Sequence, residues 1–235
     1  MKRLTILIIS LLMLFVAAQA YAYGVTIVKD AGTTEETTAL TGFETAGDMM
    51  VGMAFTAFFS GGGSETRYWI DLSDEEGGVF GDYWSMQVSG DTFYDSAWLL
   101  GANLPYGITS LYIDAGLGDT VFDTDYSPYP GTTGSASGKD FEVESGQLSD
   151  ITATYYGAVA LTGSDPVGDL YRYLKIDFAS AFASGEMVFT QDTDNILLAG
   201  DINPVNPVPE PATMLLLGSG LIGLVGLGRR KLRKR

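Results

Sequence analysis

Residues 83–89, YWSMQVS, carry the pattern that decides the fold. Trp84, Met86 and Val88 fall on one side of an extended chain, and the two serines and the glutamine at 85, 87 and 89 fall on the other. This alternation is typical of a β-strand with one buried face, because successive side chains of a strand point in opposite directions. Residues 151–161 and 170–178 repeat the pattern, so the sequence predicts a protein built from strands.

Short segments of this kind follow one another at roughly eight-to-twelve-residue spacing, with Gly, Asp and Asn turns between them, as in sandwiches and barrels. We therefore expect an all-β fold, a jelly-roll-like antiparallel β-sandwich in a single domain over residues 23–202. Residues 33–41, 73–82 and 123–139 are expected to be loops. Residues 49–59 are apolar on both faces, which favours a central strand and leaves a helix as the alternative. The expected strands are 24–29, 49–59, 67–72, 83–89, 96–100, 108–114, 121–122, 141–144, 151–161, 170–178, 185–190 and 195–198.

The N-terminus has the three parts of a secretory signal peptide. Met1-Lys2-Arg3 is basic, residues 4–16 are almost unbroken apolar sequence, and small-x-small sites end at Ala20 and Ala22. We expect a helical signal peptide over residues 1–22, cleaved after Ala22, with cleavage after Ala20 as the alternative. An uncleaved N-terminal membrane helix is the less favoured interpretation, because the apolar core is short.

The C-terminus has a second set of signals. Residues 203–207 form a Pro-rich tether, and Pro209-Glu210-Pro211 lies within the motif at 208–211. Residues 212–228 are uncharged and long enough for a short transmembrane helix. The basic tail at 229–235 predicts that this end stays cytoplasmic. Its orientation and stop residues are Arg229, Arg230, Lys231, Arg233, Lys234 and Arg235.

This order of Pro-Glu-Pro, short apolar helix and terminal basic cluster resembles the PEP-CTERM sorting signal of exported bacterial proteins. The resemblance covers residues 208–235 and implies that the chain is the substrate of an exosortase, a membrane protease. It implies that Pro209, Glu210 and Pro211 are the recognition element. The signal describes how the protein is delivered, and an ordinary C-terminal anchor is the alternative interpretation.

Composition excludes several classes of function. Between the two signals lie five basic and 28 acidic residues, so the exported segment has a net charge of about −23. Such a surface repels nucleic acid and anionic lipid. The chain has no cysteine and no histidine, which excludes disulfides, Ser-His-Asp and Cys-His catalysis, and the usual zinc sites. We expect no enzymatic activity.

The densest groups of oxygen ligands are Asp123-x-Asp125 and Asp192-x-Asp194-Asn195. Hard cations such as Ca²⁺ take six to eight oxygen ligands, so these five residues are the candidate Ca²⁺ ligands. The alternative is that each aspartate forms a turn and no cofactor is bound. The acidic segment with Asp71, Asp74, Glu75 and Glu76 is a third candidate. A glycosidase carboxylate pair is not marked by any motif.

Aromatic residues offer another candidate, because exposed rings stack on sugars. We expect most of those in strands to belong to the core, with the tyrosine hydroxyls reaching its rim, and those in the 123–139 loop to be exposed. The aromatic residues considered are Tyr68, Trp69, Tyr83, Trp84, Tyr94, Trp98, Tyr126 and Tyr129.

Together these features predict an exported protein of the cell surface or of an extracellular polysaccharide matrix, with a structural or adhesive role. A carbohydrate- or Ca²⁺-binding module is the alternative. The expected partners are an exosortase, signal peptidase with the general secretion machinery, the membrane before processing, and exopolysaccharide.

Overall fold

The computed structural model describes residues 23–30, 32–42, 44–93, 97–125, 131–135 and 137–198. All of them belong to the first of two units into which the chain divides, residues 1–199. The predicted signal peptide, tether, sorting motif, membrane helix and basic tail lie outside the described residues, as do Tyr94, Tyr126 and Tyr129. Within the described ranges, no helix has the length and apolar character needed to cross a bilayer.

The described residues form one 13-stranded sheet and two single-turn 3₁₀ helices, so the prediction of an all-β fold is confirmed. The helices are η1 (Gly47–Met50) and η2 (Ala115–Gly118). The strands are β1 (Val25–Lys29), β2 (Glu35–Gly42), β3 (Ala54–Phe59), β4 (Ser64–Tyr68), β5 (Ile70–Ser73), β6 (Glu76–Phe80), β7 (Trp84–Ser89), β8 (Trp98–Asp114), β9 (Thr120–Asp123), β10 (Glu142–Ser145), β11 (Ile151–Leu161), β12 (Leu170–Thr190) and β13 (Asp192–Leu198).

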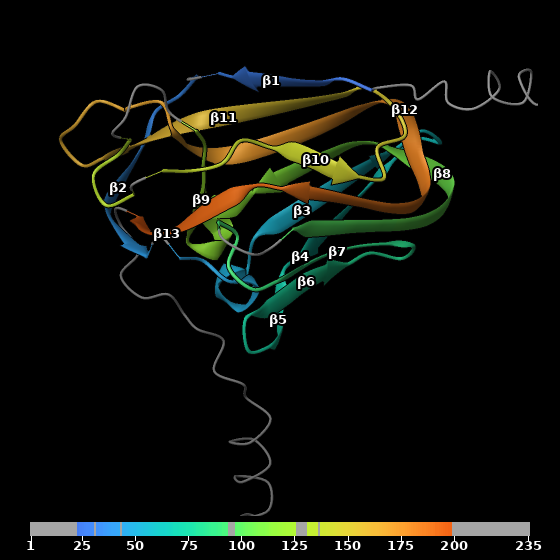
Figure 1. Cartoon of the computed structure of the whole chain (residues 1–235), viewed down its shortest axis with the longest axis horizontal. Coiled ribbons are helices and arrows are strands. Elements are labelled where there is room, and N and C mark those ends of the chain that lie inside the picture. The colour runs from blue at the N-terminus through green and yellow to red at the C-terminus, as the bar shows by residue number, and fades with distance from the viewer. Residues whose placement is uncertain are drawn as a thin grey trace, which may run out of the picture. The chain divides into compact units, whose positions relative to one another are not determined.

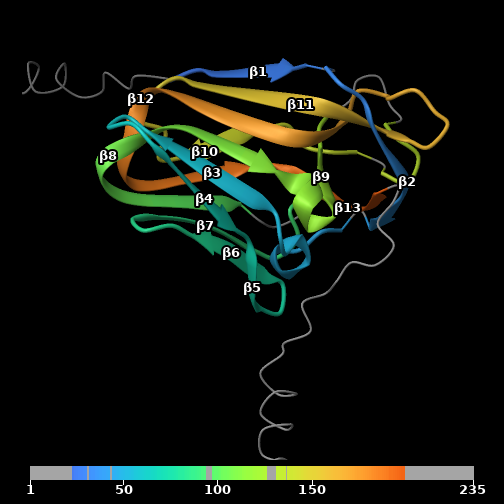
Figure 2. The same cartoon turned by 180° about the vertical axis from the view of Figure 1, so that it is seen from behind.

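Two long antiparallel strands, β8 and β12, organise the sheet. They pair along most of their lengths, and their register shifts between Asp177 and Ser184, where both strands bend at one edge of the domain (Figures 1 and 2). On one side of the bend they pair with β3 and β11, and on the other with β7 and β10. The continuous sheet therefore folds back on itself as two layers with the core between them.

The sheet is mixed, so the prediction of a purely antiparallel arrangement is wrong. β1 and β2 follow one another along the same edge of β11, and both run parallel to it. Val25 pairs with Ile151, and Glu35 pairs with Val159. Short-range alternation in the sequence could not reveal this, because the partners lie more than a hundred residues apart.

Several predicted boundaries are wrong for a related reason. The segments at 96–100 and 108–114 are one strand, β8, and those at 170–178 and 185–190 are one strand, β12. The chain stays extended through the bend, so its glycines and Pro105 do not end the strand. The predicted loop at 33–41 contains β2, and the loop at 73–82 contains β6. Residues 49–59 begin in η1 and become β3 only at Ala54.

The prediction for β7 is confirmed by its bounds and burial, and that for β11 by its bounds. Burial does not alternate along the whole of β11, because Thr154, Ala158 and Ala160 are also buried. Trp84, Met86 and Val88 are buried, as their alternation requires. A row of ring contacts crosses the core: it runs from Phe55 to Trp69, on to Trp98, and then to Phe189, with centroids 5.4 to 6.0 Å apart. These side chains come from both layers, so burial of aromatic surface joins the layers.

Candidate metal centre

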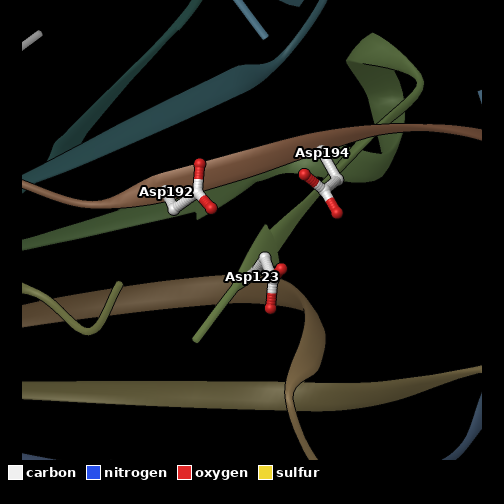
Figure 3. Close-up of side chains that lie close together, drawn as sticks. All are labelled: Asp123, Asp192 and Asp194. Carbon is white, nitrogen blue, oxygen red and sulfur yellow. The ribbon is translucent and has the colours of Figure 1, made fainter. Parts of the chain in front are cut away.

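Three aspartates meet where β9 pairs with β13 (Figure 3). Asp123 ends β9 and lies directly opposite Asp192 in the antiparallel register. Asp194 is two residues further along β13, so it shares a face with Asp192. The pairing therefore brings all three carboxylates to one place, with one oxygen of each within 4.8 Å of the others.

The cluster is almost completely buried: Asp123 and Asp192 are 1 % exposed, and Asp194 is 0 % exposed. Oδ2 of Asp192 and both carboxylate oxygens of Asp194 have no hydrogen-bond partner among the described residues. Burying a carboxylate without a compensating partner costs several kcal/mol, so the cluster calls for a proton or a cation.

Burial also changes the acidity of each group. It raises the pKa of Asp123 to about 8 and that of Asp192 to about 9, and repulsion from Asp194 adds to both. It raises the pKa of Asp194 to about 7, with Asp169 and Asp91 adding to the effect. The cation-free protein therefore reaches neutral pH with this cluster partly protonated.

Neighbouring polar groups hold the cluster in place. The hydroxyl of Ser135 donates to Oδ2 of Asp123, and the hydroxyl of Thr92 donates to Oδ1 of Asp192 at 3.2 Å. Ser135 lies close enough to lower the pKa of Asp194 somewhat, but its single proton is already given to Asp123. The Gln191 amide, directly before β13, donates to the carbonyl oxygen of Asp123 at 3.3 Å. These contacts fix β9, β13 and the 131–135 segment around the carboxylates.

No described lysine or arginine forms an ion pair with any of the three aspartates. Lys29 lowers the pKa of Asp123 only from a distance, because its ammonium pairs with Asp140 at 2.9 Å. The oxygens of three carboxylates, with the Ser135 hydroxyl beside them, form a donor set that suits a hard divalent cation. The residues present therefore fit Ca²⁺ by the chemistry of their donors, with one converging oxygen from each of the three aspartates.

The structure separates the other two predicted ligands from the cluster. The Asn195 side chain accepts from Thr45 at 2.9 Å and donates to the Met49 carbonyl at 3.3 Å. Asp125 is exposed, and its carbonyl oxygen accepts from Lys29. Alternation along β13 sends residue 195 to the opposite face from Asp192 and Asp194, which explains the first case.

The remaining candidates are placed elsewhere. The acidic segment at 71–76 is exposed, and Glu76 there accepts from Ser73 and Ser89. All three tryptophans, at 69, 84 and 98, are buried in the core. Tyr68 and Tyr83 are 60 % and 61 % exposed, so these two are exceptions to the expectation that most strand aromatics belong to the core.

Ser135 and Thr92 were not among the residues predicted from the sequence. Neither lies within ten residues of the aspartate that it contacts, so no local motif could have identified them. The available signal was the two-residue spacing of Asp192 and Asp194, which places both on one face of any strand.

Comparison with known proteins bears on the other end of the chain. Residues 207–234 match the family described as the PEP-CTERM protein-sorting motif. The chain carries a PEP-CTERM sorting motif. The motif marks an exported exosortase substrate that is anchored transiently in a membrane, and it contains the predicted Pro209, Glu210 and Pro211. Neither the comparison with curated proteins nor that with solved structures found a match to this chain.

Proposed function

We propose that the mature protein is a structural or adhesive component of the cell surface or the extracellular polysaccharide matrix, and that its β-domain binds Ca²⁺. The observation that carries the Ca²⁺ assignment is the buried cluster of Asp123, Asp192 and Asp194, with three carboxylate oxygens that lack hydrogen-bond partners among the described residues. The sorting motif supports a site of action outside the cell, where Ca²⁺ is more abundant than in the cytoplasm.

A structural role for the ion follows from where its ligands lie. Asp123 belongs to β9, while Asp192 and Asp194 belong to β13, the last of the described strands. A cation held by all three would link β13 to β9 and remove the repulsion between the carboxylates. Their burial also leaves no path for a sugar chain, which argues against a glycosidase use of these acids.

We further propose that residues 1–22 are a signal peptide removed by signal peptidase after passage through the general secretion machinery. The apolar segment at 212–228 would then hold the chain in the membrane, with the basic tail at 229–235 in the cytoplasm, until exosortase acts. Both proposals rest on the distribution of apolar and basic residues in the sequence.

Calorimetric titration tests the ion site directly. Mature protein recovered from producing cells and freed of metal should bind one Ca²⁺ at neutral pH, with release of protons because the cluster is partly protonated. Asp194→Asn should weaken binding at least tenfold, whereas the exposed Asp71→Asn should not change it. Absence of Ca²⁺ uptake by the folded wild-type protein would refute the ion site.

Cell fractionation tests the place of action. The mature domain should be recovered from the cell surface and the extracellular matrix. Recovery from the periplasm alone would refute the proposed surface role, whatever the outcome of the Ca²⁺ titration.

A further inference from the structure

Two hollows on the domain surface meet at Tyr83. One has a volume of about 410 Å³ and is lined by Glu65, Arg67 and Tyr106, among others. The other has a volume of about 700 Å³ and is lined by residues that include Ser85 and Asn103. Asp82 and Tyr83 belong to both linings, so the hollows form one groove, which we call the Tyr83–Tyr106 groove. Each volume lies in the range of small-molecule sites, roughly 300–1,000 Å³.

The two tyrosines present exposed rings along the groove. Tyr83 is 61 % exposed and Tyr106 is 62 % exposed. A Cβ atom placed on Gly61 would lie 2.7 Å from Cγ of Tyr106, so one face of this ring rests on the Gly61 backbone. With that face covered and most of the residue exposed, the other face of the ring is open to solvent. The absence of a side chain at Gly61 thus makes Tyr106 a supported, flat platform.

Polar groups lie beside the rings. The Arg67 guanidinium uses Nη2 to pair with Asp82 at 3.0 Å and with Glu65 at 2.5 Å. Among the described residues, Nε and Nη1 of Arg67 have no hydrogen-bond partner, and the Asp82 side chain is 73 % exposed. The groove therefore offers free donors and free acceptors next to two apolar ring faces.

We propose that the Tyr83–Tyr106 groove binds a neutral polysaccharide. A pyranose ring has an apolar C–H face that packs on an aromatic ring and a rim of hydroxyls that hydrogen-bond to charged side chains, and the groove supplies both. The exported segment has a net charge of about −23, which disfavours an anionic polymer. Two adjoining hollows separated by Tyr83 suit an extended chain of sugars rather than one sugar.

Native electrophoresis of the mature protein through gels containing a soluble polysaccharide tests this proposal. The gels contain hydroxyethylcellulose, dextran or galactomannan as neutral polymers, and alginate as an anionic one. We expect retardation in at least one neutral gel and none in alginate. Tyr106→Ala and Tyr83→Ala should each weaken that affinity at least tenfold. Tyr68→Ala is the matched control, because Tyr68 is 60 % exposed but outside the lining, and it should have no effect.

Gly61→Ala tests the platform itself, since the added methyl group must displace the Tyr106 ring while leaving both tyrosines in place. We expect at least fivefold weaker retardation with an unchanged melting temperature. Lack of retardation in every neutral gel, or equal loss in Tyr68→Ala, would overturn the proposal. The inference specifies the adhesive contact of the proposed function and rests on it for the partner's location. Calcium titration and cell fractionation test that function separately, so the proposed function and the polysaccharide inference can each fail without the other.

Discussion

Asp194→Asn should stabilise the protein without Ca²⁺ and reduce the stabilisation that Ca²⁺ provides. Asp194 is buried, and neither of its oxygens has a hydrogen-bond partner among the described residues, so the substitution breaks no described hydrogen bond. The protein without metal must either protonate this carboxylate or keep a buried negative charge. With Ca²⁺ bound, the same carboxylate becomes a ligand of the ion. The two effects together therefore test whether the cluster is a cation site.

The magnitude follows from the acidity of the group. The pKa of Asp194 is about 7, against an ordinary value of 3.8, and this difference is worth about 4 kcal/mol of folding free energy. Below the ordinary value both states are protonated and nothing is lost. As pH rises, the unfolded chain ionises first, so stability falls until the folded group ionises near pH 7. Above that pH the whole cost is present.

Asparagine removes this cost but leaves a buried amide, which costs about 1–3 kcal/mol when unpaired. In a chelator at about pH 8, the variant should therefore be more stable than the wild type by about 2 kcal/mol. At 2–4 °C per kcal/mol for a domain of this size, its melting temperature should rise by about 4–8 °C. Calcium at a hundredfold excess over its dissociation constant should stabilise the wild type by about 2.7 kcal/mol.

Differential scanning calorimetry at about pH 8, in chelator and in excess Ca²⁺, measures both effects. The variant should melt above the wild type in chelator, and Ca²⁺ should raise its melting temperature less than that of the wild type. Asp71→Asn, which changes an exposed acid, should follow the wild type in both. The reasoning is refuted if Ca²⁺ raises the melting temperatures of the wild type and Asp194→Asn equally, or if the variant melts below the wild type in chelator.

Three further predictions concern the pH dependence of Ca²⁺ binding, two glycines in the sheet, and the C-terminus. The Ca²⁺-induced rise in melting temperature should shrink as pH falls from 8 to 5, because protons compete for groups with pKa values of about 7 to 9; a rise independent of pH would contradict the site. Gly77→Ala should lower the free energy of unfolding, measured in urea, by at least about 3 kcal/mol, because the added Cβ would lie 2.0 Å from the Gly47 carbonyl oxygen. Gly101→Ala is the control: its added Cβ would lie 3.4 Å from the nearest neighbouring atom, so the free energy of unfolding should change by no more than about 1 kcal/mol. Intact-mass analysis of the mature protein should find a C-terminus near Pro209 that is lost in Glu210→Ala; a mass that retains Arg235 would instead indicate a permanent membrane anchor.

The sequence predicted what depends on near neighbours along the chain. Alternation depends on residues two apart, and β7 has the expected bounds and burial. β11 has the expected bounds, but its burial does not alternate along its whole length. It did not predict the parallel edge of β11, because nothing near Val25 or Glu35 indicates a partner more than a hundred residues away. The polar segment at 33–41 was interpreted as a loop, since its threonines do not alternate with apolar residues, yet it contains most of β2.

The candidate metal centre shows the same division. Asp192 and Asp194 share a face because they are two residues apart, and this could be predicted directly from the sequence. Asp123 joins them only through the pairing of β9 with β13, about 70 residues later in the chain. The same pairing excludes Asn195, which local density of oxygen ligands had included. Ligand sets that come from different strands need the strand register before they can be assigned.

The position of the first two strands in the sheet has a consequence for the order of folding. Among the strands that the structure describes, β1 pairs only with β11, and β2 pairs only with β11 and β13. If the chain is exported N-terminus first, β1 and β2 therefore cross the membrane before the strands with which they pair. Contacts between distant residues form slowly, so we expect no folded intermediate that contains β1 or β2 before β11 emerges. The sheet closes only when β13, the last strand before the sorting motif, has crossed the membrane, so completion of the fold and recognition of the motif become consecutive events.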